Sequence, residues 1–150
     1  MNDRFKFRAW DKTENAYIED AQFTYDDGCE GGVGSFRHYS FRDLLEDKNC
    51  IPEQCTGLKD KNGKLIYEGD ILDFDLSTPR NGGHYRGFIR WEEHNEIIGW
   101  VISDMDMAGE WDLRQIAHPN DWMVWGEIIG NIHENRELLE FNPEDYDIRV

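Results

Sequence analysis

Hydrophobic and polar residues alternate near the start of the chain. Residues 5–9 read Phe-Lys-Phe-Arg-Ala, and a two-residue period of this kind is typical of a half-buried strand. Residues 11–15 are polar and predict a turn, and residues 16–18, Ala-Tyr-Ile, can return as the partner strand. The pattern therefore predicts an N-terminal β-hairpin, with Phe5, Phe7 and Ala9 on its apolar face.

The hydrophobic spacing changes after a Gly-rich and acidic stretch at residues 26–35, which we interpret as a loop. Ser40 is a suitable N-cap with Asp43 three residues later, and residues 41–45 carry hydrophobic side chains at helical spacing. Asn49 to Pro52 ends this short helix. Residues 1–52 are thus predicted to form a hairpin, a loop and a helix, an extension too small to build a core alone.

Turn signals become dense from Glu53 onward. Asn62-Gly63 is a strong hairpin signal because glycine accepts a positive φ, and Glu68-Gly69-Asp70 is a second predicted turn. Short apolar or alternating runs lie between the turns, at residues 65–67, 71–76, 87–91, 97–102, 123–125 and 128–129. Such short strands with tight turns indicate a small, mostly antiparallel β barrel over residues 53–141. Asn135 can cap a short C-terminal helix, and residues 142–150 form a charged tail.

Composition supports a folded domain and restricts its partners. The chain has 150 residues, 13% of them aromatic, and a net charge of −16, whereas disordered chains are poor in aromatic residues. Residues 91–150 hold 15 acidic residues against three Arg, a net charge of −12. This charge disfavours direct binding to nucleic acid. It suits a basic protein partner, although solubility alone explains it as well.

Cysteine use and the N-terminal sequence favour a cytoplasmic protein. Cys29, Cys50 and Cys55 are odd in number and scattered, which is typical of reduced thiols. The N-terminus has no apolar secretory core, and no stretch approaches the length of a membrane span.

Three separated blocks carry a family resemblance. They are Phe-Arg-Ala-Trp-Asp at residues 7–11, the stretch at residues 56–71, and Glu-Ile-Ile-Gly-Asn-Ile-His-Glu-Asn at residues 127–135 followed by Glu-Leu-Leu at 137–139. Together they resemble the YopX-like family of phage and prophage proteins. The resemblance implies an SH3-like β barrel in the C-terminal portion, an unknown molecular function, and a bacterial host cytoplasm as the location. It supplies no catalytic residues.

Two candidate metal sites are weak on ligand spacing. Zinc could use Cys29, His38, Cys50 and Cys55, but only the last two approach the usual spacing of two to four residues. A partial calcium loop comprises Asp104, Asp106, Gly109 and Glu110, but Ala108 and Gln115 stand at ligand positions, the latter where a bidentate Glu is required. We predict no metal and no cofactor at either place.

Acidic residues also cluster at the second predicted turn. Asp73 and Asp75 share one face of a predicted strand, and Glu68 and Asp70 lie close by in sequence. Such carboxylates could serve a metal-assisted enzyme that acts on a nucleotide or another small molecule. A solvated strand face gives the same pattern, and we expect Asp70 to fix the turn through backbone amides.

Tryptophan residues crowd the C-terminal half. Trp91, Trp100 and Trp125 lie in or beside predicted strands, where we expect most such residues to be core. Trp111 and Trp122 lie in predicted polar loops, and they are therefore our candidates for an exposed partner contact.

Two classes of function remain open. We favour a non-catalytic phage accessory protein that binds a basic host or phage protein or assembles with itself, with imitation of DNA charge as a narrower version. The alternative is the metal-assisted enzyme. The histidines, His133 among them, lie isolated in polar stretches, and we assign them no role.

Overall fold

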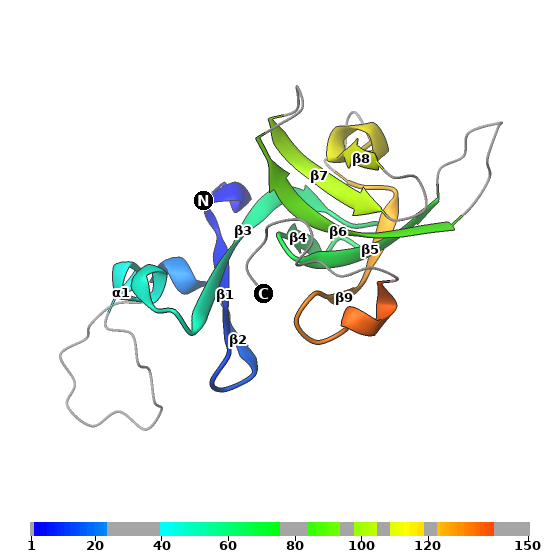
Figure 1. The fold of residues 1–150 in the computed structure, drawn as a ribbon. Coiled ribbons are helices and arrows are strands. Elements are labelled where there is room, and N and C mark those ends of the chain that lie inside the picture. The colour runs from blue at the N-terminus through cyan, green and yellow to red at the C-terminus, as the bar shows by residue number, and fades with distance from the viewer. Residues whose placement is uncertain are drawn as a thin grey trace.

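The fold was analysed in a computed structural model, which describes residues 2–23, 40–75, 84–93, 98–104, 109–118 and 123–139. The chain is mainly β, with two antiparallel sheets and few, short helices. One sheet has the strand order β2-β1-β3-β4, and the other has the order β8-β7-β6-β5-β9. In Figure 1 β1 and β2 stand apart from β5, β6 and β7, and the long strand β3 reaches from one group to the other.

The strands of the first sheet are β1 (Phe7–Asp11), β2 (Ala16–Ile18), β3 (Cys50–Lys59) and β4 (Leu65–Tyr67). Those of the second are β5 (Asp70–Asp75), β6 (His84–Glu92), β7 (Gly99–Asp104), β8 (Gly109–Asp112) and β9 (Gly126–Asn131). The helices are α1 (Phe41–Glu46) and the 3₁₀ helices η1 (Asp3–Phe5), η2 (Ala21–Phe23), η3 (Leu113–Ile116) and η4 (Arg136–Leu138). None of these helices is long and apolar enough to cross a membrane.

The predicted N-terminal hairpin is confirmed, but its two faces are not one apolar and one solvent-exposed face. β1 pairs with β2 and, on its other edge, with β3. Both faces of β1 are buried, because Ala9 lies in a small core while Arg8 and Trp10 are covered on the opposite face. Phe5 precedes the strand in η1 and is exposed. Arg8, the polar residue between Phe7 and Ala9, therefore does not face solvent.

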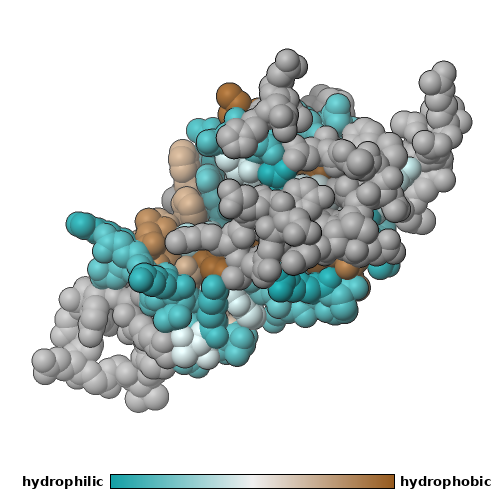
Figure 2. Space-filling view, in the orientation of Figure 1, coloured by the Kyte–Doolittle hydropathy of each residue, from teal (hydrophilic) through white to brown (hydrophobic). Residues whose placement is uncertain are grey.

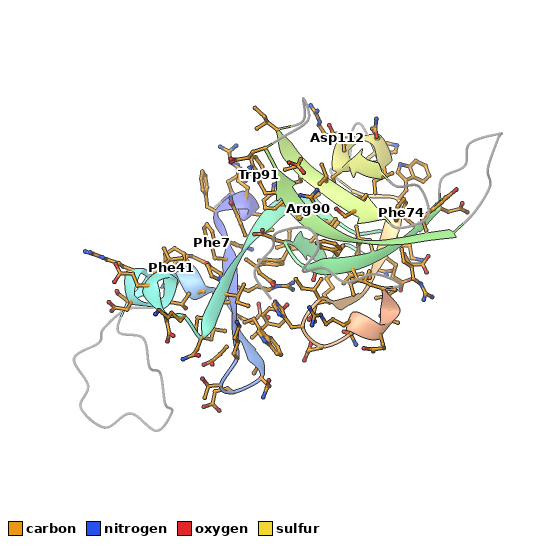
Figure 3. All side chains as sticks on the ribbon, in the orientation of Figure 1. Phe7, Phe41, Phe74, Arg90, Trp91 and Asp112 are labelled. Atoms are coloured by element: carbon orange, nitrogen blue, oxygen red, sulfur yellow. The ribbon has the colours of Figure 1, made fainter. Side chains whose placement is uncertain are left out.

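The helix α1 follows the predicted signals and covers the N-terminal core. The Ser40 hydroxyl accepts a hydrogen bond from the Asp43 amide, as an N-cap does. Leu44 is fully buried, and the rings of Phe7 and Phe41 pack with their centroids 5.2 Å apart (Figure 3). This small core contains Ala9, Ala21, Leu44 and Cys50.

The hairpin of β3 and β4 turns at the predicted Asn-Gly pair. Gly63 has a φ of +81°, and the buried Asp60 carboxylate accepts from the amides of Asn62 and Lys64, each at 2.9 Å. Its second oxygen accepts from the Ile128 amide at 3.1 Å. One aspartate therefore closes the turn and also joins it to β9 of the other sheet.

The second sheet has a core on each face. Leu72, Phe74, Ile89 and Ile102 belong to the larger cluster, which also includes Ile66 and residues of η3. On the opposite face Ile71 and Phe88 pack with Ile132 and Leu139. The short C-terminal helix is a single 3₁₀ turn. Asn135 stands at its N-cap position, but its side chain makes no capping bond and accepts instead from the Asn131 amide at 3.2 Å.

The segment between the predicted strands at residues 97–102 and 123–125 is not all loop. Ser103 and Asp104 lie in β7, and Gly109 to Asp112 form β8, which pairs with β7. This edge strand is polar in sequence, and pairing with the β7 backbone is what makes it a strand. The predicted boundary between residues 52 and 53 falls within β3, and the predicted tail at 142–150 lies outside the described residues.

Candidate functional site

The two sheets meet at a buried charged cluster, which we call the polar junction and which consists of Arg8, Glu53, Asp70 and His133. Arg8 Nε donates to Glu53 Oε2 at 2.7 Å, and Arg8 Nη2 donates to Asp70 Oδ1 at 2.7 Å. Nη2 also reaches the Glu68 carbonyl at 3.2 Å. A single arginine on β1 thus connects the first sheet to the turn before β5.

Glu53 has a second partner from a distant segment of the chain. Its Oε1 lies 2.6 Å from His133 Nε2. The turn residue Gly69 approaches the same oxygen so closely that a Cβ on it would lie 2.7 Å from Oε1. Gly69 also has a φ of +82°, so glycine is required there for two separate reasons.

Aromatic rings enclose the charged groups. The Arg8 guanidinium carbon lies 4.2 Å from the ring centroid of Tyr17 and 4.8 Å from that of Tyr67, distances at which cation–π attraction operates. Trp10 stacks on His133 with centroids 4.9 Å apart and planes 3° from parallel. The rings limit the access of water to the junction and so strengthen its ion pairs.

Carboxylates outnumber cations around Arg8, and the pKa values of two buried carboxyls, Asp70 and Glu68, are raised. Burial raises the pKa of Asp70 to about 6, although Arg8 and the Tyr67 amide oppose the shift. Burial, with a further contribution from the Glu53 charge, raises the pKa of Glu68 to about 7. Burial disfavours the charge of Arg8, but Asp70 and Glu53 outweigh it and raise the pKa of the guanidinium. The junction therefore holds a permanent cation and binds protons near neutral pH.

Beside the junction lies a cavity of about 490 Å³. It is bounded by β4 and β9, the edge strands of the two sheets. Its lining comprises Arg8, Tyr17, Glu19, Lys64, Leu65, Tyr67, Asp70, Ile128, Ile129, Gly130, Asn131, Glu134 and Asn135. The cavity thus combines an apolar wall with polar groups, as small-molecule sites commonly do.

The cavity is closed at both ends by backbone hydrogen bonds between the sheets. The Lys61 amide donates to the Gly126 carbonyl at one end, and the Ile132 amide donates to the Gly69 carbonyl at the other, both at 2.9 Å. An additional strand therefore cannot run between β4 and β9, although a compact group can enter the cavity.

A second feature is the exposed hydrophobic surface on one side of the molecule. The exposed fraction is 78% for Ile98, 51% for Phe5 and 42% for Trp91. Trp91 lies on β6 near the end of the β6–β7 hairpin (Figure 3) and packs edge-on against Trp100 at 5.1 Å. Figure 2 shows hydrophobic colour at this end of the hairpin and again beside η1 and α1, where Phe5 and Leu45 are exposed.

The predicted contact residues are only partly placed by the structure. Trp111 lies in β8, paired with Ile102, and not in a loop; Trp122 lies outside the described residues. We expected most of the other tryptophans to lie in the core. This is wrong for Trp91, which is 42% exposed, and for Trp125, which is 63% exposed. Strand position alone does not bury a tryptophan at the end of a hairpin.

The predicted acidic cluster does not converge. Asp70 accepts from the Tyr67 amide at 2.8 Å, which confirms its predicted role in the turn, and it also binds Arg8. Asp73 pairs with Arg86 at 3.3 Å across the strands. Over the described ranges, no group of three or more His, Cys, Asp and Glu side chains is arranged to hold a metal ion.

The candidate zinc ligands are divided in the same way. Cys50 and Cys55 are buried on β3 and form no disulfide with each other. They are five positions apart, so the pleat directs them to opposite faces. Cys29 and His38 lie outside the described residues. Of the candidate calcium loop, Gly109 and Glu110 belong to β8, whereas Asp106 and Ala108 are not described.

Sequence reasoning missed Arg8, Glu53 and His133. Arg8 was grouped with the solvent face of β1, and His133 was assigned no role. A signal was nevertheless present. Residues 7–11, 56–71 and 127–135, on which the family resemblance rests, all contribute to the polar junction or its cavity.

Comparison with known proteins relates the chain to a protein family and to a solved structure. A family model described as YopX protein matches residues 6–140. The crystal structure of protein EF1440 from Enterococcus faecalis is similar, with a TM-score of 0.54 and 28% sequence identity over 90% of this chain and 97% of that one. No curated protein matches the chain.

Proposed function

The chain belongs to the YopX protein family, and we propose that it is a non-catalytic protein-binding module of a phage or prophage that acts in the cytoplasm of a bacterial host. The observation that carries this proposal is the exposed hydrophobic surface, which we name the hairpin-end surface and define as Trp91, Ile98 and Trp100. Tryptophan is enriched among residues that dominate binding energy at protein interfaces.

The chemistry around this surface supports a basic partner. The exposed Glu93 adjoins Trp91, and the Trp91 indole donates to its carboxylate at 2.9 Å. A hydrophobic centre with an acidic border suits a partner that presents an apolar side chain among lysines or arginines. The net charge of −16 adds long-range attraction to such a partner.

Catalysis by the predicted acids has less support. Asp70 and Asp73 are each engaged by an arginine, and Glu68 lies beside Glu53. None of these carboxylates faces a nucleophile or base that would make it a general acid or base partner.

Two finer proposals accompany this function. We interpret the five-stranded sheet, together with β3 and β4, as an SH3-like barrel, a fold on which exposed aromatic residues often grip extended peptides. Self-assembly through the hairpin-end surface is the alternative use of the same residues, and Trp111 and Trp122 remain further candidate contacts.

The test is affinity capture of partners from host lysate during infection, with the parent chain, Trp91→Ala/Ile98→Ser and Trp125→Ala. Trp125 is a suitable control because it is also an exposed tryptophan but lies at the opposite end of the sheet, next to the β5–β9 pair Phe74–Gly126. We expect the double variant alone to lose the partner, and captured basic partners to be released as salt is raised.

Light scattering of the same variants separates the alternatives. Loss of an oligomer in the double variant identifies self-assembly through this surface. Retention of every partner and of the oligomeric state by the double variant contradicts the proposal.

A further inference from the structure

The cavity between β4 and β9 offers more hydrogen-bond donors than its surroundings use. Arg8 engages Glu53, Asp70 and Glu68 through Nε and Nη2, and its Nη1 has no hydrogen bond to any part of the chain that the structure describes. Arg8 is only 7% exposed and lines the cavity. The Nη1 nitrogen is therefore available to donate to an acceptor in the cavity.

Other lining groups add to this excess of donors. The Tyr17 hydroxyl is buried near the Glu53 carboxylate and makes no well-formed hydrogen bond with the described residues. The Tyr67 hydroxyl and the Asn135 side-chain amide nitrogen also make no hydrogen bond within the described ranges, since Asn135 uses only its oxygen, on Asn131. Arg8, Tyr67 and Asn135 can therefore donate hydrogen bonds to a group in the cavity.

The charges of the lining argue against an anionic ligand. Glu19, Asp70 and Glu134 oppose Arg8 and Lys64, and Glu53 lies directly behind Arg8 at 2.7 Å. Anion sites need a surplus of positive charge, which is missing here. An acceptor-rich ligand that carries no charge avoids this repulsion.

The remaining lining residues are apolar or aromatic and suit an aromatic ligand. Leu65, Ile128 and Ile129 contribute apolar atoms, and Tyr17 and Tyr67 contribute aromatic rings. The volume of about 490 Å³ falls in the range of small-molecule sites. The closed ends of the cavity exclude a polypeptide that runs through it.

We propose that this cavity binds an uncharged, planar heterocycle with several hydrogen-bond acceptors, the chemical class of nucleobases and nucleosides. The Arg8 Nη1 nitrogen and the Tyr67 hydroxyl donate to the ring acceptors, and the apolar wall covers one face of the ring. This site is separate from the hairpin-end surface, and either can exist without the other.

The experiment is calorimetric titration of the full chain with adenosine, guanosine, cytidine and uridine and with their monophosphates. Tyr67→Phe removes one hydroxyl and keeps the ring that covers Arg8, so it should weaken nucleoside binding about fivefold. Leu65→Trp should abolish binding because the larger side chain fills the cavity. Trp125→Ala, which lies outside the cavity lining, should leave nucleoside affinity unchanged.

Binding of at least one nucleoside that is weakened by Tyr67→Phe supports the proposal, even if Leu65→Trp fails to fold. Circular dichroism establishes whether each variant is folded. The proposal is overturned if no nucleoside binds, if Tyr67→Phe or a folded Leu65→Trp binds as the parent does, or if a monophosphate binds more than about tenfold tighter than its nucleoside.

Discussion

At the scale of single residues, the polar junction shows how a charged group can be kept inside a small protein. Arg8 has two carboxylate partners and two aromatic rings around it. Buried ion pairs contribute little net stability, but removal of one partner leaves an uncompensated charge. The junction therefore fixes the position of the two sheets more than it adds to their stability.

Gly69 is the residue where this arrangement is least tolerant of change. We expect Gly69→Ala to reduce the free energy of unfolding by about 3 kcal/mol or more, because the new Cβ meets a carboxylate held by Arg8 and His133 in addition to the cost of a positive φ. Urea denaturation measures the change.

Gly63→Ala is the matched control. Gly63 has nearly the same φ, +81°, but its Cβ would have no neighbour within 4 Å, so only the backbone cost of about 1–2 kcal/mol applies. Equal losses in the two variants would show that contact with Glu53 plays no part.

At the scale of secondary-structure elements, sequence signals succeeded where the interactions are local. The Ser40 cap, the Asn62-Gly63 turn and the hairpin of β1 and β2 are predicted by the sequence and confirmed by the structure. Each depends on residues that are close in sequence. Signals of this kind identify an element and its nearest partner.

Pairings between distant segments were not predictable in the same way. The strand β5 pairs with β9 over residues far apart in sequence, and nothing local in either strand names the other. The same reason explains why Arg8 was taken for a solvent-facing residue, since its partners Glu53 and Asp70 come from other segments. The position of Trp91 at a hairpin end is likewise a property of the assembled sheet.

Asp60 is the element-scale contact that we expect to matter most. Asp60→Ala should lower the free energy of unfolding by about 2–4 kcal/mol, because three backbone amides, of Asn62, Lys64 and Ile128, lose their acceptor. Thermal and urea denaturation measure this loss.

The neighbouring Lys61→Ala is the control. Its ion pair with Glu127 is solvent-exposed on both sides, and exposed pairs contribute little, so stability should stay close to that of the parent. If Asp60→Ala is as stable as Lys61→Ala, the turn tolerates the missing acceptor and Asp60 does not join the sheets.

At the scale of the whole molecule, the carboxyls at the junction link stability to pH. The folded-state pKa values of Glu68 and Asp70 are raised to about 7 and about 6. Their contribution to stability is therefore fully present below about pH 4 and is lost as the pH rises through 6 and 7.

Glu68→Gln tests this link because glutamine cannot lose a proton. The variant should be more stable than the parent at pH 8, by on the order of 1–3 kcal/mol, and close to it at pH 5. Urea denaturation across this range gives the profile, with the exposed Glu137→Gln as the control. A constant difference between parent and Glu68→Gln at all pH values would contradict the assignment of a raised pKa to Glu68.

The order in which the partners of Glu53 are synthesised affects how the chain folds as it leaves the ribosome. Arg8 and Glu53 leave the ribosome early, whereas His133 belongs to a stretch that is synthesised 80 residues after Glu53. Until that stretch emerges, Trp10 has no imidazole to stack upon, and β9 is not yet in place beside β5. A prematurely terminated polypeptide would thus expose its central carboxylates and an open sheet edge, which are features that chaperones and proteases of the cell can use to remove it.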